Sequence, residues 1–276
     1  MEATLDIQAV KKIWFPKEHG AWAMTFSPIV SGFIVAGAVG WTGAWLFLSV
    51  LMFFLIRQPA VTIVRGLKNR RKADFSVWLL FAAEFLLLTL AGLIVLRRMP
   101  RVEWLGFGAL AAASLLIYLF FVSKRKEMTA PAEVATVSGV CIGAPAGYFA
   151  ATGRLDGTAL ALLLLNLAYF VPNIFYIRLK ARVQARQAPP DSWRGYLKAG
   201  MPLLSYNALG WLINLAGVAA GAMQPLALLA LVPNALKDVW AVAKWHTRTQ
   251  LDIRRRGWME VGHLLLFLAL VKLLVG

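Results

Sequence analysis

Three ionisable residues, Lys17, Glu18 and His19, stand side by side directly before an apolar stretch that is long enough to be a membrane helix. A histidine beside a carboxylate can transfer protons, and a lysine can hold an anion. Two interpretations are open. These side chains either anchor the chain at a membrane surface, or they form one wall of a binding site. We predict the second, with Lys17 binding substrate and with Glu18 and His19 as catalytic groups.

Basic residues also occur inside the next apolar stretch. Arg57 and Gln58 precede Pro59, and Arg65 and Lys68 follow on the helical face of Arg57. Arginine at membrane depth normally faces the interior of a helix bundle or water, whereas residues near a helix end can extend their charge to the surface. We therefore predict that Arg57, Gln58, Arg65 and Lys68 bind an anionic substrate.

A polar stripe follows the sixth apolar stretch, with polar side chains at three- and four-residue steps: Asn166, Tyr169, Asn173, Tyr176 and Lys180. One interpretation is hydrogen bonding between helices. The other is a binding surface, for which we predict Asn173, Tyr176, Arg178 and Lys180 as substrate-binding residues.

The last two apolar stretches add charged residues. Lys237 and Asp238 are predicted to bind substrate. Glu260 and His263 share one helical face, and Glu260 is a further catalytic candidate because a carboxylate beside a histidine can move protons. Glu84 lies alone in the third stretch and is either functional or structural. Glu133 is expected to form an ion pair with the basic segment 124–126.

The elements that carry these residues predict an all-α polytopic membrane protein. The mean hydropathy is +0.67 and 15% of residues are charged, against about 25% in soluble domains. Nine apolar stretches are each long enough to cross about 30 Å of hydrocarbon: 21–40, 42–64, 75–96, 104–122, 130–151, 157–177, 200–221, 224–243 and 257–275. We expect a cytoplasmic segment over 1–20 and one nine-helix transmembrane domain over 21–276.

Short connections and small residues constrain the packing. Tight turns at Gly40–Trp41 and Ala222–Gln224 make the flanking helices antiparallel neighbours. Small residues share one face of the fifth stretch and favour close helix packing: Thr136, Gly139, Gly143 and Gly147.

The net charge of +16 has a topological explanation. With the N-terminus inside, only five of the 29 Lys and Arg lie outside and the other 24 lie inside; the outer ones are Arg97, Arg98, Arg101, Arg154 and Lys272. Positive charge gathers in cytoplasmic loops, so we predict the N-terminus inside and the C-terminus outside. Nucleic acid is not an expected partner, whereas anionic lipids are. Cys141 is the only cysteine, which excludes a disulfide framework.

The segments FPKEHGAWAM, IRQP and RRRGWMEVGH resemble the YwiC-like family of bacterial membrane proteins. The resemblance covers most of the chain. The layout also resembles the UbiA-type intramembrane prenyltransferases, which have nine helices, an inside N-terminus and functional loops on the inner face. The segment PKEHGAWAMTFSPIVSGF is similar to the Lys-Pro-x-Gly…Pro pattern that opens their first helix. This resemblance implies a UbiA-like bundle.

The chain departs from the UbiA-type pattern at the metal site. Those enzymes carry Asp-rich clusters after the second and sixth helices, which bind Mg²⁺ and through it a prenyl diphosphate. Here Arg and Lys occupy these stretches, and the first acids are Asp74 and Asp191. We therefore predict neither a metal site nor a cofactor. Either basic side chains hold the anion directly, or the fold serves another use.

The predicted function is binding of an anionic amphiphile (an isoprenoid phosphate, a quinone or a related lipid) in a basic cavity at the cytoplasmic side of a bacterial plasma membrane. A divergent prenyltransferase-like enzyme independent of Asp-bound magnesium is one form of this hypothesis. A transporter for a small anion or a proton-coupled solute is the alternative, and a structural or assembly role is a third. The expected partners are membrane lipids and an isoprenoid or quinone ligand.

Overall fold

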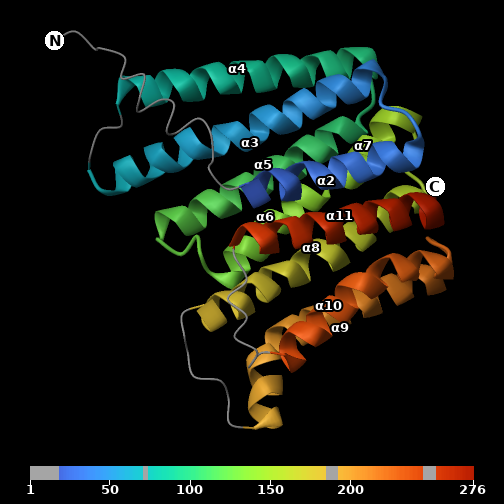
Figure 1. Cartoon of the computed structure of the whole chain (residues 1–276). Helices are drawn as coiled ribbons and strands as arrows, with labels where there is room; N and C mark the ends of the chain where they lie inside the picture. The colour runs from blue at the N-terminus through green and yellow to red at the C-terminus, as the bar shows by residue number, and fades with distance from the viewer. Residues whose placement is uncertain (1–18, 71–73, 185–191, 245–252) are drawn as a thin grey trace.

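A bundle of long helices makes up the computed structural model, which describes residues 19–70, 74–184, 192–244 and 253–276 (Figure 1). These residues contain no β-strand. Their elements are α2 (His19–Ala36), α3 (Gly40–Lys68), α4 (Phe75–Arg98), α5 (Glu103–Ser123), α6 (Ala130–Cys141), α7 (Gly143–Thr152), α8 (Gly157–Gln184), α9 (Trp193–Ala219), the 3-10 helix η1 (Pro225–Leu231), α10 (Val232–Ala243) and α11 (Ile253–Val275).

Within the described residues the elements form nine helical segments, because two of the segments are interrupted helices. The pair α6 and α7 makes one apolar segment over Ala130–Thr152, and η1 and α10 make another over Pro225–Ala243. Seven segments are long and apolar enough to cross a membrane. The other two are α2, which is short, and α9, which carries polar side chains such as Lys198 and Asn207. The predicted multi-pass helical membrane protein is confirmed at this level.

Prolines cause both interruptions. Pro145 has no N–H to donate to the carbonyl of Cys141, and its ring crowds that carbonyl, so the helix breaks at Ile142. Pro233 likewise cannot donate to Leu229; the N–H of Val232 bonds the Leu229 carbonyl instead, in the 3-10 pattern. The interruption at Ile142 was not visible in the apolar runs of the sequence.

The connections alternate between the two ends of the bundle (Figure 1). At one end a guanidinium nitrogen of Arg125 donates to Asn69 Oδ1 at 2.7 Å, so the α3–α4 and α5–α6 connections meet. At the other end a Cβ added at Gly157 would lie 2.8 Å from the carbonyl oxygen of Ala222, so the α7–α8 and α9–η1 connections meet. The basic residues predicted to share one membrane side thus gather at one end, which we call the basic end: Arg65, Lys68, Lys124, Arg125 and Arg178.

Glycine allows α2 and α7 to approach closely. A Cβ at Gly32 would lie 2.2 Å from the carbonyl oxygen of Ala144, and one at Gly147 would lie 2.5 Å from the carbonyl oxygen of Ile29. Gly139, on the same predicted face, instead packs against Ser114 of α5. The predicted packing role of these small residues is confirmed, but the face serves two neighbours rather than one.

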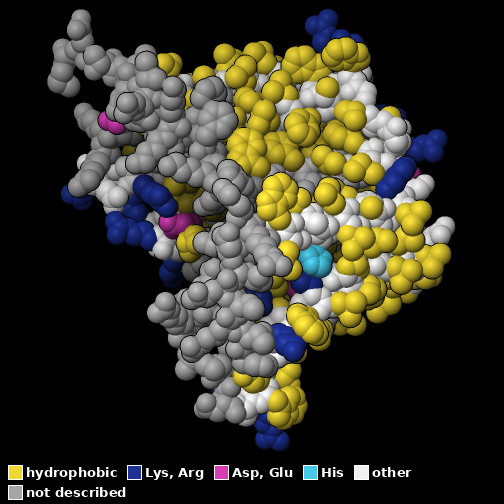
Figure 2. All heavy atoms as spheres, in the orientation of Figure 1, with side chains coloured by type: hydrophobic (Ala, Val, Ile, Leu, Met, Phe, Trp, Pro, Cys, Tyr) yellow, Lys and Arg dark blue, Asp and Glu magenta, His cyan; other side chains and the backbone are white. Residues whose placement is uncertain are grey.

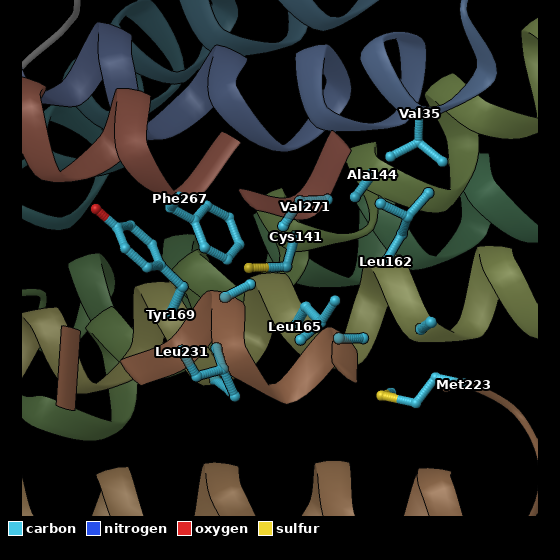
Figure 3. Packing of buried hydrophobic residues seen from close by; sticks show 14 of the residues in the cluster. Val35, Cys141, Ala144, Leu162, Leu165, Tyr169, Met223, Leu231, Phe267 and Val271 are labelled. Carbon is cyan, nitrogen blue, oxygen red and sulfur yellow. The ribbon is translucent and has the colours of Figure 1, made fainter. Parts of the chain in front are cut away.

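The main hydrophobic cluster lies around α8, between α2, α6, α7, η1 and α11 (Figure 3). Tyr169 stacks on Phe267 with ring centroids 4.2 Å apart, and the Tyr169 hydroxyl points away from the neighbouring apolar side chains. Hydrophobic side chains also cover much of the described surface on the right of Figure 2. An apolar interior and an apolar exterior together are typical of a bundle that is surrounded by lipid.

The first helix is shorter than predicted. It ends at Ala36 rather than near residue 40, because Gly37 adopts a φ of +72° that only glycine takes up easily. The turn therefore lies at 37–39, and Gly40, with a φ of +59°, opens α3. The second predicted turn, at Ala222–Gln224, is confirmed between α9 and η1.

The contact between α2 and α7 gives a first prediction. Gly32→Ala places a methyl group against the backbone of α7, which has no room for it, so we expect a loss of about 1–3 kcal/mol of stability. Thermal unfolding in detergent measures the loss. Gly92→Ala on α4 is the matched control, since no atom lies within 4 Å of its added Cβ. Equal melting temperatures for the two variants would contradict the close contact.

The orientation in the membrane gives a second prediction. Cys141 is fully buried, so the natural chain serves as an unreactive background for labelling with a membrane-impermeant maleimide. Arg154→Cys should react in intact cells, and Lys126→Cys at the basic end only after the membrane is opened. The reverse pattern would show that the basic end faces outward.

Candidate functional site

The basic residues of α3 contact α5 and the connection that follows it. Arg65 donates to Glu127 Oε1 at 2.6 Å, and Lys68 donates to the carbonyl of Ser123. The guanidinium of Arg57 lies over the ring of Tyr118, 5.0 Å from its centroid. The three cations share one face of α3, and all three contact α5 or the connection that follows it.

Arg65 is neutralised by a carboxylate outside the membrane. A hydrogen bond from its own backbone N–H and the ion pair with Arg65 hold the pKa of Glu127 below its ordinary value. The Arg65 side chain is 54% exposed, so solvent screens the pair and it contributes little to stability.

A second ion pair links α8 to α6. Arg178 donates to Glu133 Oε2 at 2.8 Å and to the carbonyl of Met128 at 2.5 Å. The expected partner of Glu133 was the basic segment 124–126, and this prediction is wrong. Glu133 lies in the first turn of α6. Because α6 packs against α8, the Glu133 carboxylate lies next to Arg178 rather than next to the preceding loop.

A third ion pair lies between α10 and α11. Lys237 donates to Glu260 Oε2 at 2.9 Å and to Asn173 Oδ1 on α8 at 2.7 Å. Its ammonium also lies 4.3 Å from the ring centroid of Tyr176. The Lys237 side chain is only 8% exposed. Three helices thus supply a carboxylate, an amide and an aromatic face to a single buried cation.

Asp238, the next residue, is fully buried and turns toward α9. Its Oδ2 accepts from Asn207 at 2.8 Å and from Asn234 at 3.5 Å. The ion pair and the carboxylate together form what we call the α8–α11 cluster: Asn173, Tyr176, Asn207, Asn234, Lys237, Asp238 and Glu260. His263 and Tyr169 lie within electrostatic reach of its carboxylates.

The predicted site residues therefore fall into two groups. Arg57, Arg65 and Lys68 face α5, whereas Asn173, Tyr176, Lys237, Asp238 and Glu260 meet in the α8–α11 cluster. Along their helices Arg57 and Asn173 lie at similar depths, about 26 Å from Gly40 and about 24 Å from Gly157. Arg178 lies between the two groups, on the contact of α8 with α6.

The remaining predicted residues lie outside these two groups or outside the described residues. Gln58 is half-buried, and its carbonyl accepts from Thr62. Lys180 lies over the outer side of Tyr176, 5.7 Å from the ring centroid. Glu84 is buried on α4. Lys17 and Glu18 lie outside the described residues, as does the side chain of His19.

Tyr118 and Glu127 were missed as partners of the basic residues. Both stand in or beside an apolar stretch with no periodic polar pattern around them, so no signal in the sequence marks them. Asn207 and Asn234 were visible as polar residues in apolar stretches, but their common target, Asp238, follows only from the packing of α9 on α10.

The side chains of the α8–α11 cluster are suited to charge and proton chemistry. Among the residues that the structure describes, no group of three His, Cys, Asp or Glu is placed to hold a metal ion. The α8–α11 cluster instead combines one buried cation with two carboxylates and a nearby histidine. Such a set can hold or relay a charge inside a membrane.

An apolar cavity of about 830 Å³ lies at the opposite end of α2 and α3 from the basic end. Its wall includes Val30, Phe33 and Ile34 of α2 and Ala44 and Phe47 of α3. With no charged lining residue, it suits a hydrocarbon chain and not a polar headgroup.

Comparison with known proteins finds one matching family model and a similar bacterial protein. Residues 15–148 match the family model described as YwiC-like protein. The chain is 27% identical over 270 residues to a Bacillus subtilis (strain 168) protein named "Uncharacterized protein YwiC", and the match covers 96% of this chain and 99% of that protein. No solved structure matches the chain.

The α10–α11 ion pair gives a third prediction. Lys237→Met leaves Glu260 and Asn173 without their partner in a poorly solvated place, so we expect a loss of about 3–5 kcal/mol. Adding Glu260→Gln should recover part of this loss in a double-mutant cycle of unfolding in detergent. The control cycle is Arg65→Met with Glu127→Gln, where solvent screening limits the coupling to less than about 1 kcal/mol. Equal coupling in both cycles would contradict the burial of Lys237.

Proposed function

We propose that this chain, which is similar to the YwiC-like family over residues 15–148, binds an anionic amphiphile of the bacterial plasma membrane at its basic end. The ligand class is an isoprenoid phosphate or a related lipid whose charged headgroup lies against α3 while its tail remains in the hydrocarbon. The observation that carries this proposal is that Arg57 makes no ion pair with any described residue.

Arg57 differs from the other basic residues of the site. Arg65, Arg178 and Lys237 each have a carboxylate partner. Among the residues that the structure describes, Arg57 makes no ion pair, and its contact is the ring of Tyr118. An arginine at membrane depth costs about 2.5–3.5 kcal/mol on insertion scales, and a cation–π contact offsets only about 0.5–2 kcal/mol. An anion is needed to offset the remainder.

A lipid phosphate has the right chemistry for this position. The planar guanidinium can donate two parallel hydrogen bonds to phosphate oxygens. Arg57 lies about 16 Å along α3 from Lys68 at the basic end, so a headgroup bound by Arg57 would lie deeper in the membrane than Lys68. Lys17, Glu18 and His19 belong to this proposal as further groups around the anion.

The resemblance to the UbiA-type prenyltransferases supports the same function. The nine helical segments of the described residues agree with the helix number of that fold, and a UbiA-like bundle is part of our proposal. Basic side chains stand in α3 and α8 where those enzymes have Asp clusters, as Arg65 and Arg178 illustrate. The proposed headgroup is therefore held directly by cations, without a bridging metal ion.

A second candidate function is transport of a small anion or a proton-coupled solute. The α8–α11 cluster favours it, because buried charges inside a membrane bundle commonly mark the path of an ion or a proton. A carrier needs a polar path that opens to both membrane faces in turn, whereas an amphiphile site needs access from the lipid alone.

The amphiphile proposal gives a fourth prediction. Arg57→Gln removes a charge-assisted contact worth about 1.5–3 kcal/mol, so the co-purifying anionic lipid should fall roughly tenfold or more. Native mass spectrometry with lipid extraction measures the bound lipid and identifies it. Arg154→Gln, which removes an arginine at the opposite end of the bundle, is the control and should retain the lipid. Bulk phospholipid in equal amounts in wild type and both variants would refute the proposal.

A further inference from the structure

Two buried side-chain oxygens of α10, on residues one helical turn apart, have no hydrogen-bond donor among the described residues. Asp238 and Asn234 lie one turn apart on α10, 0% and 2% exposed. Oδ2 of Asp238 accepts from Asn207 and Asn234, but Oδ1 of Asp238 and Oδ1 of Asn234 are both buried and both lack a donor. Two buried acceptors without a donor are costly in a membrane, where water is scarce.

The charges of the cluster do not balance when Asp238 is ionised. Lys237 is the neighbouring cation, and Glu260 already pairs with it at 2.9 Å. Both residues are close enough to act on the charge of Asp238. One cation thus faces two carboxylates, which leaves one negative charge in excess.

The other titratable groups around Asp238 do not supply the missing charge. Lys180 of α8 lies 5.7 Å from the ring centroid of Tyr176, and it is not among the charges that act on Asp238. Tyr169 of α8 is neutral in its ordinary form, and Tyr206 of α9 stacks on Phe175 with ring centroids 4.2 Å apart. His263 of α11 lies near the Lys237–Glu260 pair and is not among the groups that act on Asp238. The 3-10 helix η1 contains no titratable residue.

We propose that Asp238 is the binding site of one exchangeable monovalent cation, a proton or a sodium ion, held between Oδ1 of Asp238 and Oδ1 of Asn234. A proton on Asp238 turns this carboxyl oxygen into a donor and removes the excess charge. A sodium ion does the same through oxygen ligands, the kind that hard cations prefer. The site is independent of the proposed amphiphile site, because it shares none of its contacts with Arg57.

The cluster also has a route for exchange. Glu260 is 33% exposed, so the ion pair reaches from the buried amides to the surface of the bundle. A cation can therefore pass by way of Glu260 without a large rearrangement of α10. The change from the 3-10 helix η1 to α10 at Val232 lies directly before Asn234, and interrupted helices form ion sites in many membrane proteins.

The test is thermal unfolding of the detergent-solubilised full chain across a pH series, in sodium chloride and in choline chloride at equal ionic strength. A ligand that binds only the folded state raises the melting temperature. For sodium we expect a rise of roughly 3–6 °C per tenfold increase above the dissociation constant. For a proton we expect a melting temperature that falls with rising pH and is the same in both salts.

Asp238→Asn identifies the residue responsible. It should abolish the sodium effect or the pH effect, whichever the wild type shows, because an amide in place of the carboxylate cannot take up the proton and lacks the negative charge that balances a sodium ion. Asp74→Asn makes the same change at the exposed N-terminal end of α4 and should leave the effect intact. A wild type without either dependence, or a dependence that survives Asp238→Asn, overturns the proposal.

Asn234→Ala keeps the test decisive if Asp238→Asn does not fold. It retains the carboxylate and removes the second oxygen, so the midpoint should move to a higher sodium concentration or to a different pH. An unchanged midpoint overturns the assignment of Asn234 to the site. Because lipid is measured separately with Arg57→Gln, either proposal can fail while the other stands.

Discussion

The cost of leaving a charge unpaired inside a membrane determines how this bundle is organised. Lys237 shows the constraint most clearly, because a carboxylate, an amide and an aromatic ring from three different helices all converge on its ammonium. Those contacts fix how α8, α10 and α11 are placed around one another. Arg178 does the same for α6 and α8. The ionic contacts therefore specify helix neighbours in a solvent where apolar packing alone discriminates poorly between them.

The helix α8 connects the polar regions. At one level its Asn166 donates to Ser31 of α2, at the next its Asn173 accepts from Lys237, and near the basic end its Arg178 meets Glu133. The predicted polar stripe thus serves both of its proposed roles: hydrogen bonds between helices along one part, and a charged cluster along another. Close packing of α2 on α7 through glycine completes the bundle where no polar contact is available.

Apolar length predicted most boundaries of the helical segments to within about four residues, because crossing a membrane imposes that length on a helix. The exceptions are the end of α8 and the start of α9, where the helices extend seven residues beyond the apolar stretches. The interruption at Ile142 was missed, since Pro145 and its neighbours read as an unbroken apolar run. The partners of the charges were the least predictable feature. The sequence marks Glu133 as a charge in need of a counter-charge, but both the loop 124–126 and Arg178 qualify, and only the packing of α6 on α8 decides between them. Tyr118, the partner of Arg57, lies in the apolar run 115–122, and nothing in that run marks it as the contact of an arginine.

The helices α4 and α5 turn most of their surface outward, as the exposure of Phe85 and Leu116 illustrates. Outward positions need only remain apolar, so substitutions among leucine, isoleucine, valine and phenylalanine there leave the fold unaltered. Natural selection therefore has little to act upon along these two helices, apart from inward positions such as Glu84 and Ser114. Related sequences should diverge fastest on this side of the molecule and slowest along α8. In an alignment of such sequences, the positions that change least would be those in the interior of the bundle.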